Sequence, residues 1–177
     1  MNIAIIGAGM AGLTAARHLA AHAQITLFDK ARGVGGRMST RYAGEYEFDH
    51  GAQYFTLTDP DFRSLIEGLR TQDQAAPWDS RGLYLQGETI AKDTGKPRWV
   101  GAPRMNSIPK AMAEGLTIHL GVRVVHIEGE AGSLQLLFED GSRKGPFDAV
   151  ICTAPAPQAA ALLPEYNRTI SCEESRP

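Results

Sequence analysis

The sequence predicts an α/β fold, in which a parallel sheet with flanking helices carries a small β-meander and part of a second region. Three observations favour this fold class. Residues 3–6 are a short apolar run of the kind that forms a strand buried on both faces. A glycine turn over residues 7–12 follows at once and leads into the helix-forming segment 13–21. A second apolar run, residues 25–28, follows the helix and ends in Asp29.

The glycine turn has the spacing of a loop that binds a dinucleotide in a Rossmann-like fold. In such a turn Gly7 allows the tight bend, Gly9 lets a pyrophosphate approach the backbone, and Gly12 lets the helix pack on the strand. The N–H groups at the start of the helix then bind the phosphates.

Asp29 lies where an acid accepts a hydrogen bond from a ribose hydroxyl, and an acid at this position favours an unphosphorylated ribose. The alternative is a tight turn that binds no nucleotide. This alternative is disfavoured, because the strand, the glycines, the helix and the acid all match the context of a dinucleotide-binding turn. The predicted contact residues of this unit are Gly7, Ala8, Gly9, Met10, Ala11, Gly12 and Asp29.

Residues 30–41 form a second glycine-rich stretch, with four basic side chains, three glycines and no acid. Glycines remove steric bulk near a ligand, and arginines offer planar donors to phosphate oxygens. The stretch therefore predicts a second phosphate-facing loop, with a solvated basic loop as the alternative. The expected contact residues in it are Lys30, Arg32, Gly35, Gly36, Arg37 and Met38.

The remainder of the chain alternates short helical and strand-like segments. Residues 62–69 have apolar side chains at helical spacing, and a second helix is expected over 107–114. Between these helices, four side chains could face a planar substrate or simply pack beneath loops: Trp78, Tyr84, Trp99 and Met105. The expected strands are residues 82–86, 98–100, 117–120, 122–127, 133–139 and 147–152.

The later strands predict the β-meander. Alternation within residues 122–127 would place Val122, Val124 and His126 on one face. The Asp-Gly pair at 140–141 is a turn signal. Residues 147–152 then return to the parallel sheet, and a short helix ends near residue 163.

Length and composition describe one ordinary globular domain. The 177 residues provide a core large enough to fold without disulfides, and the net charge of −2 gives no indication of a nucleic-acid or membrane partner. No targeting segment and no membrane-spanning apolar run is visible. Cys152 and Cys172 lack metal or disulfide spacing and fit a reducing cytoplasm. The five histidines show no ligand spacing, so no metal is expected.

Two blocks of sequence resemble the FAD-dependent amine-oxidase superfamily. The first joins the glycine turn and Asp29 to the Arg-x-x-Gly-Gly-Arg run of residues 32–37, and the second is the Asp-x-Gly block within residues 48–55. Residues 35–40, the same Asp-x-Gly block and residues 99–110 resemble more narrowly the renalase-like branch of that superfamily.

The resemblance implies where each part of an FAD molecule lies. Gly7, Gly9 and Gly12 would meet the pyrophosphate and Asp29 the adenosine ribose. Arg32, Gly36 and Arg37 would hold the phosphates and the ribityl chain. Ala52, Gln53 and Tyr54 would lie near the isoalloxazine ring, and backbone atoms around Val124 would contact the adenine.

The resemblance also implies an activity: hydride transfer from a small-molecule substrate, a reduced nicotinamide dinucleotide isomer, to the flavin, with O₂ as acceptor and H₂O₂ as product. Amine oxidation is the broader alternative, and a non-catalytic dinucleotide-binding module is another. An NAD-dependent dehydrogenase is disfavoured, because the Gly-Gly-Arg loop has no role in one. No catalytic acid or base is identifiable in the sequence.

The expected organisation has three parts. Residues 1–55 and 106–165 would form the FAD-binding Rossmann-like domain, residues 56–105 a partial substrate-domain insertion, and residues 166–177 an irregular tail. The segment by which two-domain flavoenzymes of this type return to the nucleotide domain has no match, so the chain reads as the N-terminal half of such an enzyme.

Overall fold

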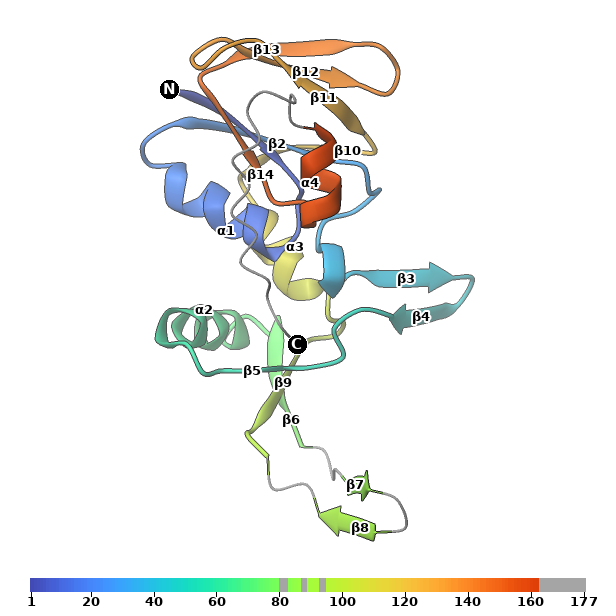
Figure 1. The fold of residues 1–177 in the computed structure, drawn as a ribbon. Coiled ribbons are helices and arrows are strands. Elements are labelled where there is room, and N and C mark those ends of the chain that lie inside the picture. The colour runs from blue at the N-terminus through green and yellow to red at the C-terminus, as the bar shows by residue number, and fades with distance from the viewer. Residues whose placement is uncertain (80–82, 87–88, 93–94, 163–177) are drawn as a thin grey trace. The chain divides into compact units, whose positions relative to one another are not determined.

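A computed structural model describes residues 1–79, 83–86, 89–92 and 95–162. The expected tail, residues 166–177, and the first residue of the expected strand 82–86 lie outside these ranges. The chain divides into two compact units (Figure 1). The first unit joins Met1–Gly36 to the chain from Met112 onward, and the second is Arg37–Ala111.

The first unit contains the predicted parallel sheet. Its strands are β1 (Asn2–Ile6), β2 (Gln24–Asp29), β10 (Thr117–Leu120) and β14 (Ala149–Cys152), in the order β10-β2-β1-β14. All three neighbouring pairs are parallel. The α/β fold class with a parallel sheet is therefore confirmed, and residues 117–120 take its edge position beside β2.

Helix α1 (Met10–Leu19) begins inside the glycine turn, three residues before the expected start. The carbonyl oxygen of Gly9 accepts a hydrogen bond from the N–H of Leu13 at 3.0 Å, so residues of the turn build the first helical turn. The helix buries Gly12, Leu13 and Ala16 and contacts β1 and β2. The glycine loop is thereby fixed to both strands.

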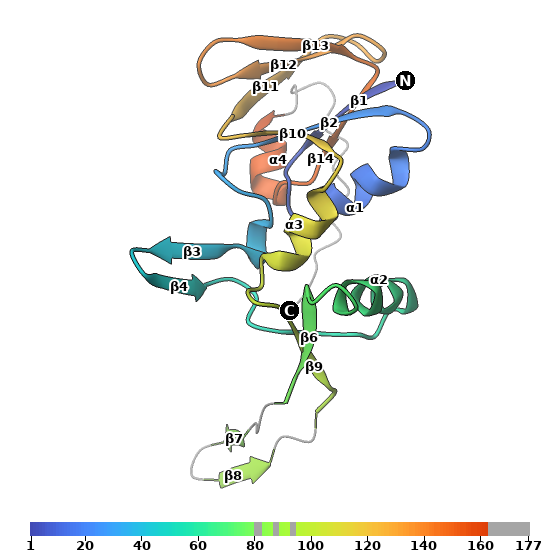
Figure 2. The same cartoon turned by 180° about the vertical axis from the view of Figure 1, so that it is seen from behind.

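The predicted meander is confirmed. It consists of β11 (Val124–Glu128), β12 (Leu134–Phe138) and β13 (Arg143–Phe147), paired antiparallel. Figures 1 and 2 show the meander and α1 on opposite sides of the parallel sheet. Ala4, Ile6 and Phe28 of the sheet join meander residues in one apolar core. Leu162 of α4 (Ala156–Leu162) packs into the same core.

Two expectations about the meander are wrong. Val122, Val124 and His126 do not alternate on one face, because a β-bulge between Val124 and His126 shifts the register and leaves Val124 and Ile127 as the buried pair. The expected strand 147–152 is divided in two at Asp148. The backbone N–H of Asp148 donates to the carbonyl oxygen of Asn2 at 2.8 Å, and the Asp148 carboxylate accepts the N–H of Asn2 at 2.6 Å.

The second unit contains short strands and one long helix. Its strands are β3 (Thr40–Ala43), β4 (Tyr46–Asp49), β5 (Phe55–Thr56), β6 (Ala75–Trp78), β7 (Leu83–Gln86), β8 (Thr89–Lys92) and β9 (Arg98–Gly101). They form the hairpins β3-β4 and β7-β8 and a three-stranded sheet in the order β5-β9-β6. The chain passes between the units within the 3-10 helix η1 (Gly36–Met38) and within α3 (Ser107–Ala113).

Helix α2 (Pro60–Arg70) matches the expected helix 62–69 and starts two residues earlier. The carboxylate of Asp59 accepts the N–H of Phe62 at 2.8 Å, and Pro60 occupies the first turn, so the start is a capped one. Ile66 and Leu69 are its buried residues. Within the described part of the chain, no helix is long and apolar enough to span a bilayer.

The compact units do not coincide with the expected segments 1–55 and 56–105. Residues 37–55 group with the residues that follow them, because β5 pairs with β9 and the phenol of Tyr42 is hydrogen-bonded to Asn106. These pairings join positions far apart in the sequence. The first compact unit therefore does not include residues 37–55 or 106–111, which group with the second unit.

Candidate cofactor-binding site

The protein itself requires glycine at two positions of the loop. Gly7 has φ +108°, and a Cβ atom there would lie 2.5 Å from Oγ1 of Thr153. A Cβ atom on Gly12 would overlap the carbonyl oxygen of Gly7. Gly7 is held in this bend because its N–H donates to the carbonyl oxygen of Phe28 at 2.8 Å. These glycines close the strand–turn–helix connection.

Gly9 is different, because no described part of the protein requires glycine there. Its φ of −79° and ψ of −179° suit any residue. A Cβ atom on it would meet Cα of Gly36 at 3.8 Å, an ordinary van der Waals contact. A side chain at Gly9 would instead occupy space at the start of α1. The residues present therefore fit a pyrophosphate that approaches the backbone at this point.

The start of α1 is suited to an anion. Among the described residues no side chain caps the helix, and its first turn has no acidic residue. The first N–H groups of a helix lack intrahelical partners and carry the positive end of the helix dipole. A phosphate at the start of α1 would satisfy both the donors and the dipole.

Asp29 holds the glycine loop in place. One oxygen of its carboxylate accepts the N–H of Ala8 at 2.6 Å, and the other accepts the N–H of Ala31 at 2.8 Å. The sequence indicated a ribose acceptor and gave no sign of this structural role. A carboxylate oxygen can accept more than one hydrogen bond, so the ribose contact remains compatible with these bonds and stays a prediction.

The second glycine stretch packs directly against the first. The N–H of Gly35 donates to the carbonyl oxygen of Ala8 at 2.9 Å, and Gly9 and Gly35 form a short parallel bridge. Gly36 has φ +55°, and a Cβ atom on it would lie 3.2 Å from Cα of Gly9. These glycines are therefore needed for the contact between the loops, a reason that the sequence did not reveal.

The connection between β10 and β11 lies against the end of β2. The N–H of Val122 donates to the carbonyl oxygen of Asp29 at 3.0 Å, and the N–H of Gly121 donates to Ala31 at 2.8 Å. Val124, expected beside the adenine, follows two residues later and is buried. The first unit thus brings the loop, Asp29, Gly35 and Gly36 together, with Val124 at the start of the meander.

The basic side chains of the second stretch are exposed. Arg32 is exposed, and Nζ of Lys30, also exposed, donates to Oε1 of Gln158 at 3.0 Å. Arg37 belongs to the second unit, where its carbonyl oxygen accepts the N–H of Ala52 at 2.7 Å. The predicted residues Met38, Gln53 and Tyr54 belong to that unit too; Met38 is buried and the other two are exposed.

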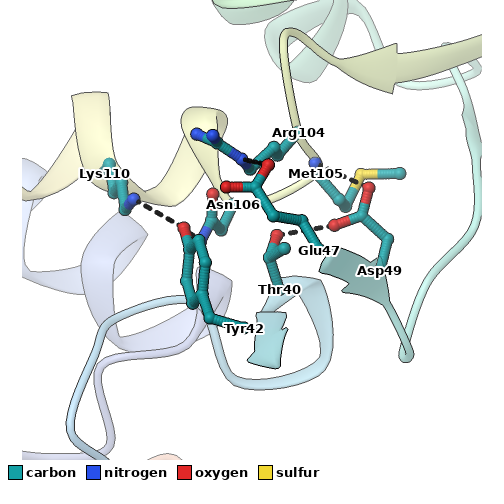
Figure 3. Close-up of polar contacts among 8 residues, drawn as sticks. All are labelled: Thr40, Tyr42, Glu47, Asp49, Arg104, Met105, Asn106 and Lys110. Carbon is teal, nitrogen blue, oxygen red and sulfur yellow. Dashed lines mark hydrogen bonds and ion pairs between the residues drawn. The ribbon is translucent and has the colours of Figure 1, made fainter. Parts of the chain in front are cut away.

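A polar cluster in the second unit joins the β3-β4 hairpin to the segment that leads into α3 (Figure 3). Nδ2 of Asn106 and Nζ of Lys110 donate to the phenolic oxygen of Tyr42 at 3.1 and 3.2 Å. The hydrogen bond from Asn106, followed by that from Lys110, lowers the pKa of Tyr42 below its ordinary value. Residues 99–110 contain a block that resembles the renalase-like branch, whereas no sequence pattern indicated a role for Tyr42.

The rest of this cluster holds the hairpin to the same segment. Arg104 forms an ion pair with Glu47, and the carboxylate of Asp49 accepts the hydroxyl of Thr40 at 2.6 Å and the N–H of Met105 at 3.1 Å. Met105, one of the four side chains considered for a planar substrate, is buried. Within the described ranges, no group of three or more His, Cys, Asp or Glu side chains could hold a metal ion.

This combination of parallel sheet, glycine loop at a helix start and acid at the next strand end defines a dinucleotide-binding Rossmann-like protein. A family model described as NAD(P)-binding Rossmann-like domain matches residues 5–69. A second, described as flavin containing amine oxidoreductase, matches residues 80–172, more than half of the chain. The chain belongs to the flavin-containing amine oxidoreductase family. Membership of this family confirms the expectation of FAD as the cofactor.

Individual relatives support the same superfamily. The chain is 45% identical over 76 residues to a 4,4'-diapophytoene desaturase of Staphylococcus haemolyticus, across 41% of this chain and 15% of the relative. It is 33% identical over 91 residues to a coproporphyrinogen III oxidase of Mycobacterium tuberculosis, across 49% of this chain and 20% of the relative. The chain thus spans a fifth or less of the length of these curated relatives.

A solved structure shows the same fold. It is a putative protoporphyrinogen oxidase from Exiguobacterium sp. 255-15, with a TM-score of 0.71 and 14% identity. The match covers 93% of this chain and 61% of that one. The likeness is one of fold and says nothing of substrate.

Proposed function

We propose that this chain is the FAD-binding part of an oxidoreductase of the renalase-like kind. The observation that carries the proposal is the position of Gly9 at the start of α1, where a Cβ atom would meet the described residues only in an ordinary contact at 3.8 Å. When bound, FAD supplies a ring that accepts a hydride from a reduced substrate and passes the electrons to O₂, which becomes H₂O₂.

Each part of the loop has a task in holding that cofactor. The N–H groups at the start of α1 bind the pyrophosphate, and the glycine at position 9 keeps the approach clear. Asp29 fixes the loop through Ala8 and accepts a ribose hydroxyl. Arg32, Arg37 and the segment 52–54 are proposed to contact the ribityl chain and the ring, on the strength of the family resemblance.

The proposed substrate is a dihydronicotinamide dinucleotide isomer. Its support is the resemblance of residues 35–40, 49–55 and 99–110 to the renalase-like branch. The runner-up is an amine, which the description of the family model favours. Cysteine usage supports a cytoplasmic location as part of the same proposal.

The test is anaerobic reduction of the FAD-loaded protein. A dihydronicotinamide dinucleotide isomer should bleach the visible flavin absorbance, and admitting O₂ should restore it and release H₂O₂. Bleaching by amines but not by the dinucleotide would establish the runner-up. Retention of FAD without bleaching by either substrate would instead identify a non-catalytic binding module.

A further inference from the structure

The three-stranded sheet of the second unit has two different faces. In its register, Arg98 on the central strand β9 lies between Thr56 of β5 and Trp78 of β6, while Trp99 lies between Phe55 and Pro77. Successive side chains of a strand point to opposite faces. Arg98 and Trp78 therefore share one face, and Trp99 belongs to the other.

Helix α2 covers the face that carries Trp99. The ring of Phe55 packs edge-on against the ring of Phe62 in α2, with centroids 5.4 Å apart. The helix also contacts β6 and buries Ile66 and Leu69. The aromatic side chains on this face thus have an evident packing role.

The opposite face presents an aromatic and cationic platform, formed by Tyr54, Trp78 and Arg98. Cζ of Arg98 lies 4.5 Å from the centre of the Tyr54 ring, and the rings of Tyr54 and Trp78 have centroids 6.0 Å apart. Tyr54 is 42% exposed and Trp78 43% exposed. Packing against α2 does not account for these two rings, since they lie on the other face.

A pocket of about 350 Å³ adjoins the platform. Its side chains combine ring or apolar surface with charge: Pro77, Trp78, Asp79, Lys96, Pro97 and Arg98. Among the described residues of the pocket, Lys96 and Arg98 carry positive charge and Asp79 carries negative charge. Its volume falls within the range of about 300–1,000 Å³ that is typical of small-molecule sites.

We propose that the platform and this pocket bind a substrate with a planar ring that carries an anionic group. The ring stacks on Trp78 and Tyr54, and the anion pairs with Arg98 and Lys96. This inference rests on the proposed function, for which it names the substrate class. A phosphate-bearing nicotinamide and a carboxylate-bearing porphyrin both have this chemistry, whereas a simple aliphatic amine does not.

The two tryptophans of the chain make the proposal testable, because one lies on each face of the sheet. Trp99→Phe leaves Trp78 as the reporter, and Trp78→Phe leaves Trp99. Both variants are saturated with FAD and titrated with nicotinate, with uncharged nicotinamide and non-planar cyclohexanecarboxylate as matched controls. Nicotinate should quench Trp78 fluorescence more strongly than either control and leave Trp99 almost unchanged.

Calorimetry on FAD-saturated protein provides a measurement that is independent of the reporters. Arg98→Met and Lys96→Met should each weaken nicotinate binding about three- to tenfold, as expected for a charge-assisted contact at a partly exposed site. NAD⁺ and coproporphyrin III then distinguish the two sources of ring and anion. The compound that binds more tightly, and whose affinity falls in Arg98→Met, shows whether the substrate is a nicotinamide dinucleotide or a porphyrin.

Failure of this inference differs from failure of the proposed function. A protein that does not retain FAD contradicts the proposed function. If FAD is retained but nicotinate affects both tryptophans equally, or binding is unchanged in Arg98→Met, the platform is not a substrate site. A change of Trp78 emission with protein concentration alone would make it a self-association surface and would also overturn the inference.

Discussion

The carboxylate of Asp29, at the end of β2, accepts the backbone N–H of Ala8 at 2.6 Å and thereby ties the glycine loop to the neighbouring strand. The residue that is expected to recognise the ribose is thus also part of the frame that shapes the phosphate loop. Loop geometry and nucleotide binding consequently depend on the same side chain.

Asp29→Ala should lower stability as well as affinity. It removes the acceptor of two backbone N–H groups, and we expect a loss of about 1–3 kcal/mol in the free energy of unfolding of the cofactor-free protein. Thermal or denaturant unfolding measures it. Lys30→Met removes an exposed contact with Gln158 and should leave stability nearly unchanged. If Asp29→Ala weakened FAD binding alone, the anchoring role would be wrong.

Gly9→Ala and Gly12→Ala should separate binding from folding. A methyl group on Gly9 meets an ordinary contact at 3.8 Å, so Gly9→Ala should fold with a stability change within about 1 kcal/mol. The same methyl group should obstruct the pyrophosphate, so the variant should bind FAD and ADP at least about tenfold more weakly. A methyl group on Gly12 overlaps a backbone carbonyl and should destabilise the fold itself. Circular dichroism and calorimetry follow the two properties, and an unchanged affinity of Gly9→Ala for FAD and ADP would refute the assignment.

Thr153 should be needed for its hydroxyl group. Its Oγ1 donates to the carbonyl oxygen of Ile6 at 3.0 Å, directly before the glycine turn. Thr153→Val removes this donor, and we expect a loss of about 1 kcal/mol in unfolding free energy. Thr153→Ser retains the hydroxyl and serves as the matched control. Equal melting temperatures for the two variants would show that the hydrogen bond contributes nothing.

Tyr42 should ionise below the ordinary pKa of a tyrosine. Its phenolate accepts hydrogen bonds from Asn106 and Lys110, so Lys110→Met should raise the pKa of Tyr42 back toward the ordinary value. Ultraviolet titration against Tyr42→Phe isolates this residue. Arg104→Gln should have a smaller effect, because Arg104 acts on Tyr42 through charge alone.

The sign of the pH effect follows from the lowered pKa of Tyr42. The phenolate is favoured in the folded state, so its contribution to stability is fully present only above the pKa of an unfolded tyrosine, about 10. The contribution disappears as the pH falls through the folded pKa. At neutral pH, Lys110→Met should therefore change stability only through the lost hydrogen bond and the lost cation–π contact with the neutral Tyr42 ring.

Much of the first unit follows from local sequence. Residues 3–6, the glycine turn and the run ending in Asp29 predicted the succession of β1, turn, α1 and β2 correctly, because apolar runs and glycine spacing report backbone requirements within one short segment. The start of α1 was misplaced by three residues, since residues 10–12 of the turn already belong to the first turn of the helix. The identity of the cofactor followed from the same segment and its resemblance to a family.

Tertiary structure decided the features that depend on distant partners. The bulge at Val124 and His126 follows from pairing with β12, and the edge position of β10 from pairing with β2. Gly35 and Gly36 have positive φ angles where the second stretch meets the first loop, and no local pattern reveals this contact.

The two tryptophans show the same division most clearly. Trp78 and Trp99 were equivalent candidates for a planar substrate, because both are aromatic residues between the two expected helices. Their cross-strand register assigns Trp99 to the face under α2 and Trp78 to the open face beside Arg98. A strand's sequence sets which residues alternate, but only the pairing of strands with each other and with a helix decides which face is buried.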